Sequence, residues 1–219
     1  MNSPLLQLLV LAGIAVFLIL RLKNVLGTRD GYEPPREAGP QPAERRGPEL
    51  EVIEGGPDRD ILDHAEEGSV TASALASMKT ADPSFGVSDF LEGARGAYEM
   101  ILMGFEKGDL ASIKPFLADE VYETFAEVVE ARDKQGLTIE SEFVGVREMA
   151  LHEAIFDDET REGEISVRFI GELTYVVRDK AGDVVEGSES QIKRQKDIWT
   201  FARAMGSDDP NWQLVATGE

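Results

Sequence analysis

The stretch GEISVRFIGELTYVVRD, residues 163–179, decides the fold class of this chain. Apolar side chains recur at every second position, and polar side chains occupy most positions between them. This period of two is typical of a β-strand that buries one face and exposes the other. The segment DKAGD, residues 179–183, is rich in turn-forming residues and predicts a hairpin. The side chains predicted to point inward are those of Ile165, Val167, Phe169, Leu173, Tyr175 and Val177.

Four strands are predicted, and short turns join them. They cover residues 142–156, 164–178, 185–203 and 212–217. The last two form an aromatic hairpin that carries the only two tryptophans of the chain, Trp199 and Trp212. Because short connections join antiparallel neighbours, these strands predict an antiparallel sheet.

Before Gly136 the apolar period is 3.6, which predicts three helices. They begin near Ser88, Asp109 and Glu120. Gly93 and Gly96 in the first helix lack the context of a phosphate-binding loop, so we interpret them as sites of close helix packing. Helices followed by strands indicate an α+β fold in which helices cover one face of a curved sheet, like a cone with an apolar interior.

The N-terminus carries an uncharged apolar run, PLLQLLVLAGIAVFLIL, residues 4–20. A helix of this length can just span a bilayer. Nothing basic precedes the run and no small-residue cleavage pattern follows it, so an uncleaved anchor is favoured over a signal peptide or a buried core helix. Arg21, Lys23 and Arg29 follow directly and predict that the long body lies on the cytoplasmic side.

Three regions follow from these patterns. Residues 1–26 are predicted to be a transmembrane anchor with a basic flank, and residues 82–219 a folded domain. Residues 27–81 are rich in Pro, Gly and charge, which predicts a flexible acidic linker with a weak helix at most near its end. His64 in this linker is expected to be a solvated side chain.

Composition excludes several functions. The net charge of -20 opposes binding to nucleic acid, and the absence of cysteine excludes disulfides, a catalytic thiolate and cysteine zinc sites. No metal-ligand spacing or cofactor motif is present, so we predict neither a metal nor a cofactor. The best catalytic candidate is His152, which could act as a base if it pointed into the sheet interior; a half-exposed strand histidine is the alternative.

One basic segment interrupts the acidic domain. Lys193, Arg194 and Lys196 are predicted to contact phospholipid headgroups or an acidic partner. The alternative is an ordinary charged sheet edge that discourages strand pairing.

Several blocks of sequence resemble a known family. They are DPSF at residues 82–85, FLEGARGAYEMILMGFEKGD at 90–109, V-Y-x-x-F at 121–125 with R-x-x-x-G at 132–136, DIWTFAR at 197–203 and DPNWQLVAT at 209–217. In this order they are similar to the C-terminal domain of mitochondrial import inner membrane translocase subunit 44 and its membrane-anchored bacterial relatives. In place of the long N-terminal region by which the mitochondrial protein recruits the Hsp70 motor, we expect the apolar anchor and the acidic linker, which puts an import-motor role in doubt.

The resemblance implies a nuclear transport factor 2-like cone of about three helices on a four-stranded sheet. It implies a membrane-anchored, non-enzymatic adaptor in a bacterial inner membrane, which binds partner proteins and acidic phospholipid. The alternative function is a small-molecule isomerase or cyclase with His152 as base. The large apolar residues either fill the core or line a binding pocket; the predicted pocket residues are Tyr98, Ile101, Leu102, Phe105, Tyr122, Phe125, Phe169, Trp199, Phe201 and Trp212.

Overall fold

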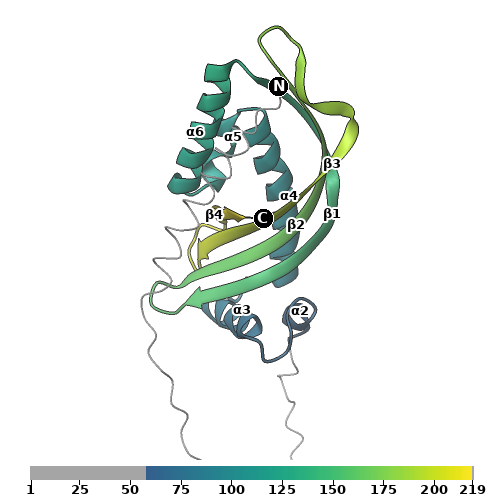
Figure 1. Ribbon diagram of the computed structural model, residues 1–219. Helices are drawn as coiled ribbons and strands as arrows, with labels where there is room; N and C mark the ends of the chain where they lie inside the picture. The colour runs from purple at the N-terminus through teal and green to yellow at the C-terminus, as the bar shows by residue number, and fades with distance from the viewer. Residues whose placement is uncertain (1–57, 219) are drawn as a thin grey trace, which may run out of the picture. The chain divides into compact units, whose positions relative to one another are not determined.

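The computed structural model describes residues 58–218, in which helices pack on one antiparallel sheet (Figure 1). This confirms the predicted α+β class and the four strands. The strand order in the sheet is the order in the chain. The strands are β1 (Thr138–Asp157), β2 (Glu162–Arg178), β3 (Val184–Ala204) and β4 (Gln213–Gly218).

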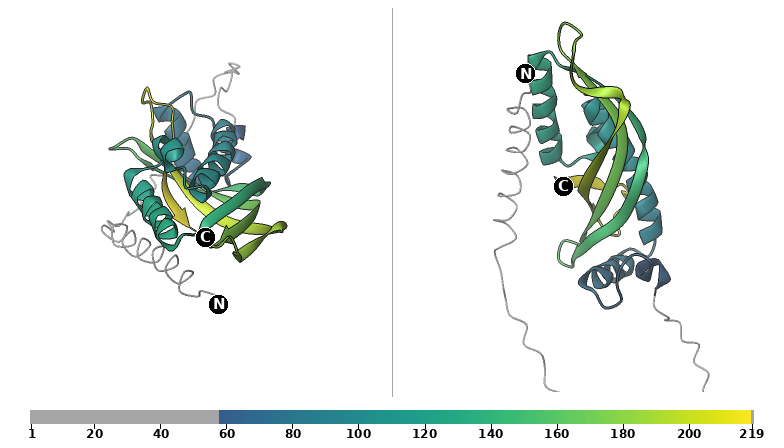
Figure 2. Two further views of the ribbon diagram at one scale, coloured as in Figure 1. Left: turned by 90° about the horizontal axis from the view of Figure 1, so that it is seen from above. Right: turned by 45° about the vertical axis from the view of Figure 1, so that its right-hand side comes forward.

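The helices all precede the sheet in the chain. They are α2 (Arg59–Leu62), α3 (Val70–Ala81), α4 (Val87–Glu106), α5 (Leu110–Ile113) and α6 (Asp119–Gln135), with the 3-10 turn η1 (Lys114–Phe116) between α5 and α6. The sheet is strongly curved, and among residues 58–218 no helix lies on its convex face (Figures 1 and 2). Helix α6 ends at Gly136, whose φ of 68° is the left-handed conformation that glycine accepts most readily.

Irregular pairing of β1 accounts for part of the curvature. The register of β1 against β2 shifts at three places, and each shift leaves one extra residue in β1: Val144, Arg147 and His152. An extra residue bends its strand and increases the local twist. Strand β1 therefore curls along its length, while the period of two in β2 stays nearly regular.

Helix α4 and the inward-facing side of β2 form the centre of the core. Tyr98 and Ile101 of α4 are fully buried, as are Ile165, Val167 and Phe169 of β2. Two helical turns separate Phe90 from Tyr98 on the same face of α4, and both are buried. The apolar side chains that recur with a period of 3.6 in α4 and with a period of two in β2 are therefore the ones that form the core.

The folded domain begins earlier than predicted. Residues 27–81 were expected to form a flexible linker, but α2 and α3 occupy the end of this range, and Leu75 and Met78 of α3 are fully buried. Small residues dominate α3, so its sequence carries only a faint apolar period. The remaining linker and the predicted anchor, residues 1–57, lie outside the described residues.

The packing role assigned to two glycines of α4 was wrong. Gly93 and Gly96 are exposed, and a Cβ added at either would meet nothing within 4 Å. Gly104 has that role instead, because a Cβ there would lie 2.5 Å from Cγ2 of Ile113. Close contact between α4 and α5 therefore depends on the last glycine of α4.

No helix within residues 58–218 is long and apolar enough to cross a membrane. The predicted membrane span at residues 4–20 and the charges Arg21, Lys23 and Arg29 lie outside the part that the structure describes.

Candidate functional site

The predicted pocket residues divide into two groups. Tyr98, Ile101, Leu102, Phe169, Trp199 and Phe201 are buried, with exposures of 4% or less. Phe105, Tyr122, Phe125 and Trp212 are only partly buried and pack against this core. The buried group fills the domain interior, and the half-buried group remains accessible to a ligand. A binding role for either group stays a prediction.

An aromatic stack holds α4 on the sheet. The Tyr98 ring lies parallel to Phe169, with centroids 4.4 Å apart, and its centroid is 4.7 Å from that of Trp199. Trp199 is therefore a packing residue of the core. Such aromatic pairs contribute about 0.5–1.5 kcal/mol beyond their buried area.

A carboxylate lies inside this stack, and sequence reasoning missed it. The Tyr98 hydroxyl donates to Oδ2 of Asp197 at 2.5 Å, and the Gln195 amide donates to Oδ1 at 3.1 Å. Burial and the neighbouring Asp197 charge raise the pKa of Tyr98, which keeps its hydroxyl a proton donor. Gly171 makes room for the hydroxyl, since a Cβ at this position would lie 2.6 Å from its oxygen.

The second tryptophan packs near the other end of α4. The Trp212 ring centroid lies 4.7 Å from that of Phe90 and 5.9 Å from that of Phe85. The Arg203 guanidinium lies 5.2 Å from the Trp212 ring and pairs with the buried Asp82 at 2.5 Å. The aromatic hairpin is thus attached to α4 at two points, one for each tryptophan.

A half-buried cluster joins α4, α6 and the sheet. Phe105 and Phe125 have ring centroids 4.5 Å apart. The Arg132 guanidinium lies 4.3 Å from the Phe105 ring and donates to the Phe105 carbonyl at 3.2 Å. On the sheet, Lys193 lies 4.4 Å from the Tyr175 ring. We call these five residues together with Glu106 the Phe105 cluster.

Glu106 is the unusual member of the Phe105 cluster. It is partly buried, and no hydrogen bond or ion pair to it is found among residues 58–218. Burial raises the pKa of its carboxyl, although the charges of Arg132 and Lys193 oppose this. Burial likewise lowers the pKa of Arg132. A carboxylate without a direct partner beside aromatic rings suits recognition of a polar group on a ligand.

The predicted basic segment does not form one patch. Lys193 points to the concave face, where it meets Tyr175, whereas Arg194 lies on the convex face and pairs with Glu172 at 2.9 Å. Lys196 is exposed and shares the parity of Arg194. Consecutive strand residues alternate between faces, so the three cations cannot contact one flat surface together.

The catalytic role considered for His152 is contradicted by the structure. His152 is exposed, and it is the extra residue of the register shift between Leu151 and Glu153. Because of this shift, the alternation of inward and outward side chains does not continue unchanged through His152, so counting from its neighbours does not put it on the inward face. The isomerase or cyclase alternative rested on a buried base, so it is withdrawn. In contrast, His64 is half-buried, and its Nε2 lies 3.3 Å from the Ser88 hydroxyl.

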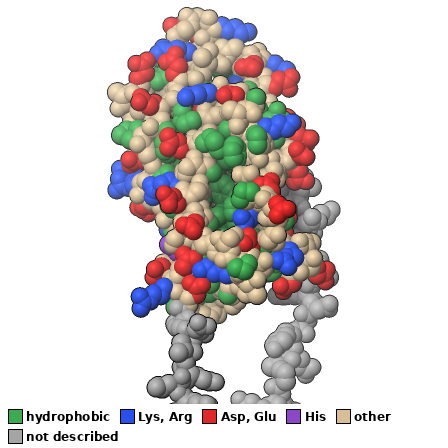
Figure 3. Space-filling view, turned by 180° about the vertical axis from the view of Figure 1, so that it is seen from behind, with side chains coloured by type: hydrophobic (Ala, Val, Ile, Leu, Met, Phe, Trp, Pro, Cys, Tyr) green, Lys and Arg blue, Asp and Glu red, His purple; other side chains and the backbone are tan. Residues whose placement is uncertain are grey.

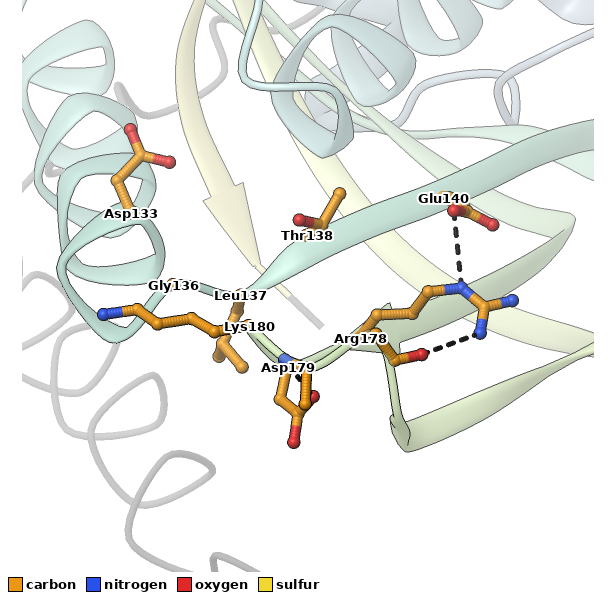
Figure 4. A pocket seen from close by; sticks show the side chains of 10 residues that line it. Asp133, Gly136, Leu137, Thr138, Glu140, Arg178, Asp179 and Lys180 are labelled. Atoms are coloured by element: carbon orange, nitrogen blue, oxygen red, sulfur yellow. Dashed lines mark hydrogen bonds and ion pairs between the residues drawn. The ribbon is translucent and has the colours of Figure 1, made fainter.

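Two surface pockets among residues 58–218 are lined by none of the predicted pocket residues. A polar pocket of about 620 Å³ lies between the end of α6 and the turn after β2, with Asp133, Glu140, Arg178 and Lys180 in its lining (Figure 4). A second, of about 420 Å³, lies between α3 and the β1–β2 turn. On the face turned away from the viewer in Figure 1, hydrophobic side chains gather around a hollow bordered by charged side chains (Figure 3).

A comparison with protein-family models matches the Tim44-like domain to residues 71–219. The chain belongs to the Tim44-like domain family. This match confirms the resemblance and starts within α3, in agreement with the early start of the folded domain.

Two further comparisons report similarity to known proteins. The chain is 23% identical over 150 residues to "Mitochondrial import inner membrane translocase subunit TIM44-1" of Arabidopsis thaliana, which covers 66% of this chain and 31% of that protein. The chain therefore spans about a third of this relative. A solved structure, the intermembrane space region of chloroplast protein ARC6, aligns with a TM-score of 0.42 at 7% identity, over 58% of this chain and 94% of that one.

Proposed function

We propose that this chain is a membrane-anchored adaptor whose folded domain binds partner proteins of a protein-translocation machinery and catalyses no reaction. The observation that carries this proposal is the family match over residues 71–219, in a family whose domains are generally not catalytic. The name of the Arabidopsis relative supports the link to translocation.

Membrane attachment is the second part of the proposal. The uncharged run at residues 4–20 would anchor the chain, and Arg21, Lys23 and Arg29 would keep the domain on the cytoplasmic side of a bacterial inner membrane. We infer further that the curved sheet and its helices form a nuclear transport factor 2-like cone. Acidic phospholipid is a second proposed ligand.

The Phe105 cluster is the partner-binding surface that the geometry favours. Its rings are half-buried, and rings of this kind serve as anchors at protein interfaces. Glu106 and Arg132 supply polar groups beside the rings, which allows a specific contact rather than nonspecific adhesion. The six fully buried pocket residues offer no such surface without opening of the core.

The test is photo-crosslinking of the full-length chain in native membranes. A benzoylphenylalanine at position 125 should crosslink to a defined set of proteins that mass spectrometry identifies. The matched control carries the same group at Val70, which is 84% exposed and lies in α3 rather than in the cluster. The anchor segment fused to an unrelated soluble domain controls for membrane proximity.

Two outcomes would decide the question. Crosslinks from position 125 that are absent from position 70 and that Phe105→Ala weakens would support an adaptor that uses the Phe105 cluster. Identical crosslinks from both positions, or none from either, would exclude this surface as the partner site.

A further inference from the structure

The convex face of the sheet carries basic side chains that its register brings together. Arg168 of β2 pairs with Ile198 of β3, Ile170 with Lys196, and Glu172 with Arg194. Residues two apart in a strand share a face, so these six side chains form a small grid. Arg147, an extra residue of β1, reaches the same grid through Glu172 at 3.4 Å.

We call Arg147, Arg168, Arg194 and Lys196 the convex patch. Of these four, the sequence analysis had predicted only Arg194 and Lys196 as patch residues, together with Lys193. Arg147 and Arg168 join it because β2 pairs with β3 and β1 pairs with β2.

The convex patch has an excess of positive charge, because its four cations face two carboxylates, Glu148 and Glu172. Arg194 and Arg147 share the single carboxylate of Glu172, and these contacts hold the pKa of Glu172 below its usual value. Within residues 58–218, Arg168 and Lys196 have no carboxylate at ion-pair distance, and both are exposed. Two cations are therefore available to an incoming anion, in a chain whose net charge is -20.

Apolar side chains and one carboxylate lie among these cations. Ile170 and Ile198 are half-buried in the same grid, Ala150 of β1 pairs with Arg168, and the exposed Glu148 of β1 pairs with Ile170. No helix among the described residues covers this face (Figure 2). The arrangement offers two cations, Arg168 and Lys196, beside a small aliphatic strip that Glu148 borders on one side.

We propose that the convex patch binds an acidic segment of a partner protein, whose carboxylates pair with Arg168 and Lys196 while apolar side chains contact Ile170 and Ile198. This inference rests on the proposed adaptor function and adds a second contact surface to it, on the opposite side of the sheet from the Phe105 cluster. Pairing opposite charges across the contact gives it specificity and fast association.

A protein segment fits the patch better than an anionic bilayer does. A convex surface touches a flat membrane at few residues, and a body with a charge of -20 is repelled as it approaches anionic lipid. At physiological salt this repulsion extends about 8 Å, so a bilayer contact brings the neighbouring acidic surface into range. A short acidic segment brings fewer negative charges near that surface than a bilayer does, so it meets less repulsion.

The test measures binding of a defined peptide to full-length protein in phosphatidylcholine nanodiscs. The probe is a short fluorescein-labelled peptide of alternating glutamate and valine, and its lysine counterpart is the control peptide. We expect the acidic probe to bind, and the double variant Arg168→Glu/Lys196→Glu to weaken binding by about tenfold or more. The control variant Lys107→Glu/Lys134→Glu changes the net charge equally at exposed positions outside the patch, and should bind as the parent does.

Several results would overturn the proposal. They are no binding of the acidic probe, equal weakening by both double variants, and binding of the lysine peptide as tight as that of the glutamate peptide. Capture of phosphatidylglycerol vesicles that only the patch variant abolishes would assign the patch to a bilayer instead. If the charge reversal disturbs folding, as judged by circular dichroism, Arg168→Gln/Lys196→Gln replaces it and should weaken binding to a smaller extent.

The proposed function is tested separately. Crosslinking from position 125 on the concave side can succeed while the patch variants bind the peptide unchanged, in which case the adaptor role stands and the convex patch fails. Failure of crosslinking with intact, patch-dependent peptide binding would count against the Phe105 cluster only.

Discussion

Tyr98 and Asp197 pose the main question at the scale of single residues, because a carboxylate in an apolar core costs free energy unless it is hydrogen-bonded. The Tyr98 hydroxyl and the Gln195 amide supply two donors, one to each carboxylate oxygen. The hydrogen bond from Tyr98 crosses from α4 to β3, so it helps to fix the position of the helix on the sheet. The contribution of the Tyr98–Asp197 hydrogen bond to the free energy of unfolding can be measured directly.

Replacing Tyr98 with Phe should destabilise the domain by about 1–3 kcal/mol, because it removes the hydrogen bond of the Tyr98 hydroxyl to a buried carboxylate. Urea unfolding followed by circular dichroism measures the change. The control is Tyr122→Phe, since Tyr122 is half-buried and its hydroxyl makes no hydrogen bond within residues 58–218. Equal stability of the two variants would show that the Asp197 contact contributes nothing.

The three glycines of α4 predict opposite effects of one substitution. Gly93→Ala and Gly96→Ala should each stabilise the domain by about 0.5–1 kcal/mol, because both sites are exposed helix interior with open space around them. Gly104→Ala should destabilise it, because the new methyl group would overlap Ile113. Thermal unfolding of the three variants shows whether each is more or less stable than the parent. Destabilisation by Gly93→Ala would refute the conclusion that Gly93 makes no close packing contact.

At the scale of elements, Asp60 connects α2 to the start of α4. Its carboxylate accepts from the backbone N–H groups of Val87 and Ser88 at 2.8 and 2.9 Å, and Lys79 of α3 pairs with it at 2.7 Å. Helix α4 begins after Gly86, which has no side chain to cap it. A residue from another element therefore provides the cap, and α2 and α3 are held to the domain by it.

The acid sensitivity of this connection has a definite sign. Burial alone would raise the pKa of Asp60, but the hydrogen bonds from Lys79, Ser88 and Val87 outweigh burial and hold the pKa far below its usual value. An aspartate in an unfolded chain has a pKa of about 3.9. Because the folded pKa is depressed, the contribution of Asp60 to stability is complete above that value and is lost as the pH falls below it.

Asp60→Asn should therefore lower stability at neutral pH by about 1 kcal/mol, the usual value of a helix cap. It should also flatten the fall in stability between about pH 5 and pH 2. Asp158→Asn, at an exposed carboxylate in the β1–β2 turn, is the control. The interpretation fails if the stability of Asp60→Asn declines in acid as steeply as that of the parent.

The same elements show which features a sequence can predict. The alternation at residues 163–179 gave the right inward face because β2 is nearly regular opposite the core. In β1 the three extra residues change the parity, which is why counting along the strand left open an inward position for His152 that the structure does not give it. Strand β3 has a register shift between Ser188 and Lys193, so the burial of Asp197 could not be inferred by counting.

Candidate site residues were predictable only as a group. Large apolar side chains do share one interior. Of the ten pocket candidates, six are buried in it and four are only partly buried. Which side chains stay accessible depends on how far α6 covers the sheet, and α6 has one buried residue, Val121. The periodicity of one strand does not show how much of the sheet α6 covers. It also does not show which residues of neighbouring strands lie side by side, as they do in the convex patch.

At the scale of the whole molecule, the two tryptophans lie on one continuous core. Trp199 packs on Tyr98 and Trp212 on Phe90, and both of these partners belong to α4. Helix α4 in turn receives its cap from α2 and packs against α5 through Gly104. The hairpin at the end of the chain is thus attached to the same helix as the elements at the start of the domain.

This arrangement predicts cooperative unfolding of the domain as one unit. In Trp212→Phe, fluorescence reports the environment of Trp199; in Trp199→Phe, it reports Trp212. Each variant should give the same urea midpoint by fluorescence and by far-ultraviolet circular dichroism, as expected when no intermediate is populated. Trp199→Phe should have the lower midpoint of the two, because Trp199 is 3% exposed whereas Trp212 is only partly buried. A fluorescence transition of Trp212 that precedes the circular dichroism transition would show that the β3–β4 end unfolds first and that α4 does not couple the two attachment points.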